Sequence, residues 1–325
     1  MISQIDLDKL IARGEIGADD VLMLRRSMNG DDHRISVEEA EALFKINDAC
    51  EGRGNEWPDF FAEAIVDFLV NQGDPRGYVS DAHADWFIAN ISSSGVVKTT
   101  TELEALVKIL EAAHQAPEKL ETFAMEQVKL AVMSGQGPTR RGEDLQPGHI
   151  GRAEVELLRR VLYACGSDQA VAISRKEAEL LFDINDAVAD VTNDASWPDL
   201  FVKAIANYLM ASRGFQPPSR QEALRRESWL DDNTTDVGGF FGKILAGGLR
   251  GIVSSYNDDS EAKLKQQQTD IAVSETVTAD EAGWLADRIG RDGQFADAEK
   301  ALLIFINTES PNIHPSLKPL LEKVA

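Results

Sequence analysis

The chain has 325 residues, of which 43% are hydrophobic and 27% are charged, a composition that is ordinary for a globular protein with one or more cores. The formal net charge of −22 repels a phosphate backbone, and no local basic patch compensates for it, so we do not expect nucleic-acid binding. No apolar run approaches the roughly 18 residues of a membrane-spanning helix, and the N-terminus lacks the pattern of a signal peptide.

The first strong helical signal is ISVEEAEALFKIND, at 35–48. Ser36 followed by Glu39 forms a capping-box pattern, which predicts that the helix begins there. Asn47 and Asp48 compete with the helical backbone for hydrogen bonds, so we expect them to end the helix. Apolar residues recur three or four positions apart, as on one face of a helix, at Ala40, Leu43 and Phe44.

Further helices are predicted in the same half of the chain. WPDFFAEAIVDFL at 57–69 carries a wide apolar stripe, and a helical pattern also covers 79–86 and 103–110. The turn at 91–98 contains a glycine. Pro58 and Pro117 stand where helices should begin, because the first turn of a helix tolerates a missing N–H. Runs of alternating β-branched residues are absent, so we expect few strands.

The same plan then repeats. ISRKEAELLFDIND, at 173–186, is identical to 35–48 at ten of fourteen positions. WPDLFVKAIANYL at 197–209 repeats 57–69, and VTADEAGW at 277–284 repeats 79–86. The prediction is an all-α fold of two tandem, duplicated halves, each with two helix–loop–helix motifs. The halves are 1–135 and 151–325, joined by a linker at 136–150. The paired tryptophans of the halves should fill equivalent places in two cores.

The second half carries an insertion, 216–276, that the first half lacks. Within it, GGFFGKILAGGLRGIVSSY at 238–256 places apolar residues on one helical face and basic residues opposite. Three interpretations stay open: docking on its own domain, insertion into the groove of a partner, and contact with anionic lipid. The residues expected to make the partner or membrane contact are Phe240, Phe241, Lys243, Ile244, Leu245, Leu249, Arg250 and Ile252.

The loops between paired helices raise the question of a metal. RDGQFADAE, at 291–299, resembles the loop of an EF-hand and also the acidic helical repeats of the TerB-like, tellurite-resistance family. The resemblance implies a calcium site in at least one loop, and three of the four loops offer a pair of carboxylates for it. In order of preference the candidate pairs are Asp292 with Glu299, Asp32 with Glu39, and Asp168 with Glu177.

The loops depart from that pattern in one respect. None offers more than two carboxylates at liganding positions, whereas an EF-hand usually provides three or four. The alternative interpretation is that each Glu caps or braces its helix, because a carboxylate in the first helical turn is favoured by the helix dipole.

The sequence contains no HExxH, no Cys/His cluster and no GxSxG motif, and GGFFGKI at 238–244 lacks the Ser or Thr of a phosphate loop. We therefore do not expect an enzyme.

The leading hypothesis is a protein-interaction or scaffold protein that needs no cofactor and binds a basic partner or one with an apolar groove. The alternatives are a calcium-binding regulatory protein and a membrane-associated factor. Cys50 and Cys165, as two free thiols, favour a reducing cytoplasm.

Overall fold

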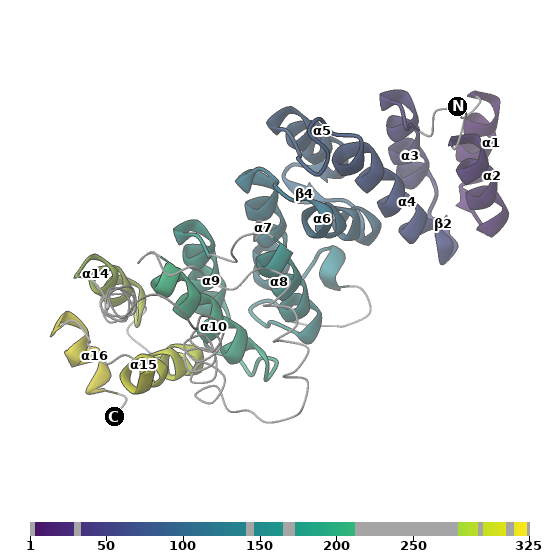
Figure 1. The fold of residues 1–325 in the computed structure, drawn as a ribbon. Coiled ribbons are helices and arrows are strands. Elements are labelled where there is room, and N and C mark those ends of the chain that lie inside the picture. Colours follow the sequence, from purple (N-terminus) through teal and green to yellow (C-terminus); the bar gives the residue numbers. More distant parts are fainter. Residues whose placement is uncertain are drawn as a thin grey trace, which may run out of the picture. The chain divides into compact units, whose positions relative to one another are not determined.

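The computed structural model describes residues 4–28, 34–140, 146–164, 173–211, 279–291, 295–309 and 315–323. Their fold is all-α, as the sequence predicts, with only short strands between the helices (Figure 1). Two compact units make up the chain. The first comprises Met1–Pro147 and Arg160–Ser167, and the second comprises Gly148–Arg159 and Asp168–Ala325.

The first unit begins with four helices: α1 (Gln4–Arg13), α2 (Ala18–Met28), α3 (Val37–Ala49) and α4 (Glu56–Val66). A π-helical turn, η1 (Asp67–Asn71), extends α4. Strands β1 (Glu15–Ile16) and β2 (Gly52–Arg53) pair in parallel. Helix α4 is the centre of this part, because it packs against α2 and α3 and buries Trp57, Phe61 and Ile65 completely.

The rest of the first unit repeats the helix–loop–helix plan. It contains α5 (Asp81–Ile91), β3 (Ser92–Ser93), β4 (Val96–Val97), α6 (Thr100–Ala112), α7 (Glu118–Ser134) and the 3₁₀ turn η2 (Pro138–Arg140). Strands β3 and β4 form an antiparallel pair across the glycine-bearing turn. Helix α6 packs against α4, which joins the two helix–loop–helix motifs of this unit into one core.

Helix α8 (Arg152–Ala164) contributes its last residues to the first unit. The Arg160 guanidinium donates hydrogen bonds of 2.8 Å to Glu104 and to Glu111 of α6. The second unit continues with α9 (Arg175–Ala187), α10 (Trp197–Ala211), α14 (Ala279–Arg288), α15 (Asp297–Glu309), η3 (Pro315–Leu317) and α16 (Lys318–Leu321). Within it, α10 packs against α9 and α15, and α14 packs against η3.

The aromatic side chains of the two units make matching contacts. In the first unit the ring centroids lie 5.3 Å apart for Phe44–Phe61, 5.6 Å for Phe44–Trp86 and 5.8 Å for Trp57–Phe61. In the second the distances are 5.0 Å for Phe182–Phe201, 5.4 Å for Phe182–Trp284 and 5.8 Å for Trp197–Phe201. Three ring contacts thus recur between the segments that the sequence pairs.

Three of the four paired tryptophans are buried, as predicted for core residues. Trp86 differs, because it is only half-buried where its counterpart Trp284 is 6% exposed. Among the residues that the structure describes, no helix combines the length and the apolar composition needed to cross a membrane.

Candidate functional site

The structure places only some of the predicted site residues. Asp32, Asp168 and Asp292, one carboxylate of each candidate metal pair, lie outside the described residues, as does the whole segment 238–256. The other member of each pair is described. These three glutamates are nearly buried, at 6% exposed for Glu39, 3% for Glu177 and 3% for Glu299.

Two of the glutamates complete capping boxes. Glu39 Oε2 accepts from the Ser36 N–H at 3.0 Å, and the Glu39 N–H donates to Ser36 Oγ at 3.2 Å. Glu177 and Ser174 exchange the same two bonds at 2.7 and 3.2 Å. The predicted capping boxes are confirmed. The first N–H groups of a helix have no intrahelical acceptor, so each carboxylate stabilises its helix in this position.

Glu299 accepts hydrogen bonds both from the start of its own helix and from the loop before it. Its Oε2 accepts from the Ala296 N–H at 2.9 Å, and its Oε1 accepts from the Gly290 N–H at 3.0 Å. Gly290 belongs to the turn after α14 and has a left-handed backbone, with φ of +66°. Both oxygens of Glu299 thus hold the backbone of the loop that the EF-hand resemblance singles out.

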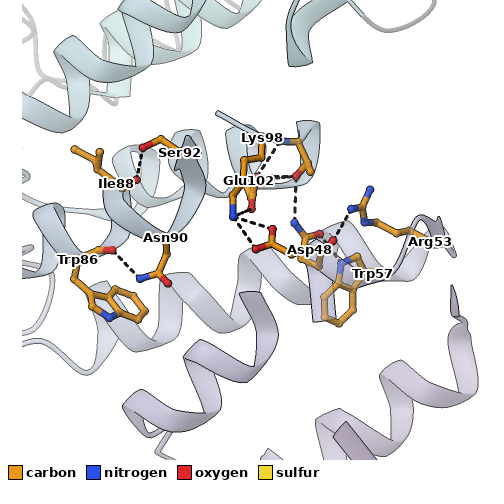
Figure 2. Close-up of polar contacts among 11 residues, drawn as sticks. Asp48, Arg53, Trp57, Trp86, Ile88, Asn90, Ser92, Lys98 and Glu102 are labelled. Atoms are coloured by element: carbon orange, nitrogen blue, oxygen red, sulfur yellow. Dashed lines mark hydrogen bonds and ion pairs between the residues drawn. The ribbon is translucent and has the colours of Figure 1, made fainter. Parts of the chain in front are cut away.

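A polar junction joins the two helix–loop–helix motifs of the first unit (Figure 2). Its central residue is Asn47 of α3, which is fully buried. The Asn47 Oδ1 atom accepts from the Trp57 indole N–H at 3.0 Å, and Asn47 Nδ2 donates to the Thr99 hydroxyl at 3.2 Å. The Arg53 guanidinium donates to the Asn47 carbonyl. One amide thereby connects α3, α4 and the N-cap of α6.

An ion pair lies beside this amide. The Lys98 ammonium donates to both carboxylate oxygens of Asp48 at 2.8 Å and lies 3.7 Å from Glu102 Oε1. The Glu102 side chain is fully buried and caps α6 through Thr99. Burial raises the pKa of the Glu102 carboxyl above its ordinary value, against the opposing effects of Lys98 and of the Thr99 hydrogen bonds. Figure 2 shows Lys98 between the two carboxylates.

The second unit builds its junction from partly different residues. Asn185 Oδ1 accepts from the Trp197 indole N–H at 3.3 Å, as in the first unit. The cation comes from another element: Arg288 of α14 donates to Asp183 at 2.8 Å and lies 3.4 Å from Glu179. Its guanidinium also stacks over the ring of Phe182, 5.2 Å from the centroid. Arg288 is 7% exposed and holds α14 against α9.

The structure corrects the role expected for the Asn-Asp pairs. Helices α3 and α9 end at Ala49 and Ala187, one residue after the Asn-Asp pairs, but the Asn side chains do not cap these ends. The side chains of Asn47 and Asn185 turn instead to the indole N–H groups, because a buried indole N–H needs an acceptor. In both halves of the sequence the repeated Asn is followed by a repeated Trp, and this recurrence was the signal that the two side chains are in contact.

Sequence reasoning also missed four junction residues. Thr99 with Glu102 is a T-x-x-E capping box, which its pattern alone indicates. The spacing of Lys98 and Glu102, four positions apart, was a further local signal. The pairs of Lys98 with Asp48 and of Arg288 with Asp183 carry no such signal, because their members are 50 and 105 residues apart in the chain.

The described carboxylates of the repeated motifs bind backbone N–H groups or neighbouring cations, and these contacts hold helices and loops together. Within the described ranges, no group of three or more His, Cys, Asp or Glu side chains is placed to hold a metal ion. Comparisons with protein-family models, curated proteins and solved structures find no match to this chain.

Proposed function

We propose that the chain is a non-enzymatic protein-interaction or scaffold protein whose binding residues lie in the insertion, 216–276. One observation carries the proposal. Trp284 meets Phe182 edge-on at 5.4 Å, as Trp86 meets Phe44 at 5.6 Å. The first unit reaches this contact through a short connection, residues 72–80, whereas the second reaches it after 212–278. The contact thus forms in the first unit without such a segment, which supports another role for the additional residues of the second half.

The short connection of the first unit shows what the insertion interrupts. Gly77 has φ of +88°, a conformation that favours glycine, and its N–H donates to the Val70 carbonyl at 2.8 Å. The second half keeps the same Arg-Gly-aromatic order at 213–215, directly before the insertion. Joining Phe215 to Val277 would reproduce the order found at Tyr78 and Val79.

The chemistry of the insertion supports a partner with an apolar groove. A helical wheel of the sequence 238–256 puts Phe241, Leu245 and Leu249 on one side, and Lys243 and Arg250 on the other. An amphipathic segment of this kind gains affinity by burying its apolar face, at about 25 cal/mol for each Å² removed from water. The remainder of the chain is strongly acidic, which favours basic surfaces around the groove.

The decisive experiment deletes 216–276 from the full chain. We expect the variant to keep its helical circular dichroism and cooperative unfolding, because α14 resumes the packing seen for α5. Proteins captured by the full chain and identified by quantitative mass spectrometry should be lost from the deletion variant. Equal recovery by the two proteins would refute the insertion as the binding segment.

A matched pair of variants identifies the face. The triple variant Phe241→Ser, Leu245→Ser and Leu249→Ser should lose the partner proteins that the full chain captures. The double variant Lys243→Gln and Arg250→Gln should still capture most of them. The reverse pattern, together with sedimentation on vesicles containing anionic phosphatidylserine, would favour the membrane-associated alternative. A saturable, calcium-specific change in tryptophan fluorescence of the deletion variant would favour the calcium-binding alternative, because that variant keeps the loop near Trp284.

A further inference from the structure

The junctions of the two units also differ at the N-cap residue, of α6 in the first unit and of α15 in the second. In the first unit the N-cap of α6 is Thr99, whose carbonyl accepts from the Leu103 N–H at 3.1 Å. In the second unit Ala296 has that place, because its carbonyl accepts from the Lys300 N–H at 3.0 Å. The capping carboxylates agree as well: Glu102 Oε2 accepts from the Thr99 N–H, and Glu299 Oε2 accepts from the Ala296 N–H, both at 2.9 Å.

The Thr99 hydroxyl has three partners in the first unit. It accepts from Asn47 Nδ2 at 3.2 Å and from the Glu102 N–H at 3.3 Å, and it donates to Glu102 Oε2 at 3.0 Å. These bonds use one donor and two acceptor positions, the full capacity of a hydroxyl group. The hydroxyl thus links the buried amide of α3 to the first turn of α6.

Alanine cannot make these bonds. Asn185 corresponds to Asn47 and is only 2% exposed, yet its Nδ2 atom is buried with no hydrogen-bond acceptor in the part of the chain that the structure describes. Leaving a buried amide N–H without an acceptor is unfavourable, because the group has lost its hydrogen bond to solvent. Alanine also lacks two heavy atoms that threonine has, the hydroxyl oxygen and the methyl carbon.

We propose that the second unit binds a water molecule at the place of the missing hydroxyl, between Asn185 Nδ2 and the N-terminus of α15. The water accepts from Asn185 Nδ2 and donates to Glu299, the carboxylate that corresponds to the one bonded to Thr99. A water molecule suits the site better than an anion, because the Glu299 carboxylate repels negative charge. Water bound inside proteins typically makes about three hydrogen bonds to polar groups of this kind.

Two nearly isosteric substitutions test the proposal in the full chain. In Ala296→Thr the hydroxyl replaces the water and its bonds, so the unfolding temperature of the second unit should equal or exceed that of the wild type. In Ala296→Val the added methyl groups displace the water without replacing its bonds, so the unfolding temperature should fall by about 2–4 °C. Thr99→Val is the matched control and should lower the unfolding temperature of the first unit.

The outcome is decided by the valine variant and by a high-resolution crystal structure. A solvent peak within hydrogen-bond distance of Asn185 Nδ2, replaced in Ala296→Thr by the threonine oxygen, would establish the site. An Ala296→Val protein as stable as the wild type, or a crystal structure in which a protein group accepts from Asn185 Nδ2, would overturn the proposal.

Discussion

At the scale of single residues, the polar side chains of the repeated motifs hold helices together. Asn47 and Asn185 accept from indole N–H groups in both units, whereas the cations beside them differ in type and origin. Lys98 reaches Asp48 from the turn before α6, and Arg288 reaches Asp183 from α14. Both units have the buried amide, because a hydrogen bond requires a defined geometry. The cation differs between the units, because charges attract over a longer range and from more varied positions.

Glu102 gives a pH-dependent prediction. Its pKa is raised in the folded state by burial, so the protonated form is favoured by folding. The stability that this provides is present at pH values below the pKa of the unfolded chain and is lost as the pH rises through the raised pKa. Glu102→Gln has no such titration. We therefore expect the wild-type unfolding free energy, minus that of Glu102→Gln, to be largest at acid pH and to decline toward neutrality.

Urea unfolding of both proteins over a pH series measures that difference. The glutamine keeps an oxygen for the Thr99 N–H, so the comparison isolates the ionisation of the carboxyl group. A difference that grows as the pH rises would mean that attraction to Lys98 outweighs the cost of burial.

At the scale of elements, the helix N-termini explain the most clearly repeated feature of the sequence. The pattern Ile-Ser-x-x-Glu begins α3 and α9 with the same pair of reciprocal hydrogen bonds. The buried capping glutamate is also present at α6 and α15, where the residue at the N-cap is Thr99 or Ala296. Capping therefore accounts for the placement of Glu in all four helix–loop–helix motifs.

The two residues of a capping box should respond differently to substitution. Ser174→Ala should reduce the unfolding free energy by about 1 kcal/mol, because a helix N–H loses its acceptor. Glu177→Gln should have a small effect, because the amide oxygen still accepts from the Ser174 N–H. Thermal unfolding measures both, with Ser36→Ala and Glu39→Gln as matched variants. A calcium-dependent stabilisation that Glu177→Gln removes would show that Glu177 is a metal ligand.

At the scale of the whole molecule, charge is the dominant property. The chain carries 55 acidic and 33 basic residues, so ion pairing leaves the net charge of −22 unchanged. Mutual repulsion of the surplus carboxylates opposes the compact state, and salt screens this repulsion.

The unfolding temperature should therefore rise between about 10 and about 150 mM sodium chloride, as the screening length falls from about 30 to about 8 Å. Circular dichroism follows the transition, and potassium chloride provides the control for ionic strength. A falling unfolding temperature would indicate that the ion pairs around Lys98, Arg160 and Arg288 outweigh the net repulsion. A rise specific to calcium chloride, at matched ionic strength, would point to a calcium site.

Local patterns in the sequence were sufficient to predict the all-α fold, the beginnings of α3 and α9, and the burial of Trp57, Trp197 and Trp284. Helical periodicity and capping depend on residues three or four positions apart, so they can be read along the chain. The junctions required the folded chain. Asn47 and Thr99 are 52 residues apart, and Arg288 and Asp183 are 105 apart, and only packing of the helices brings each pair within hydrogen-bond distance.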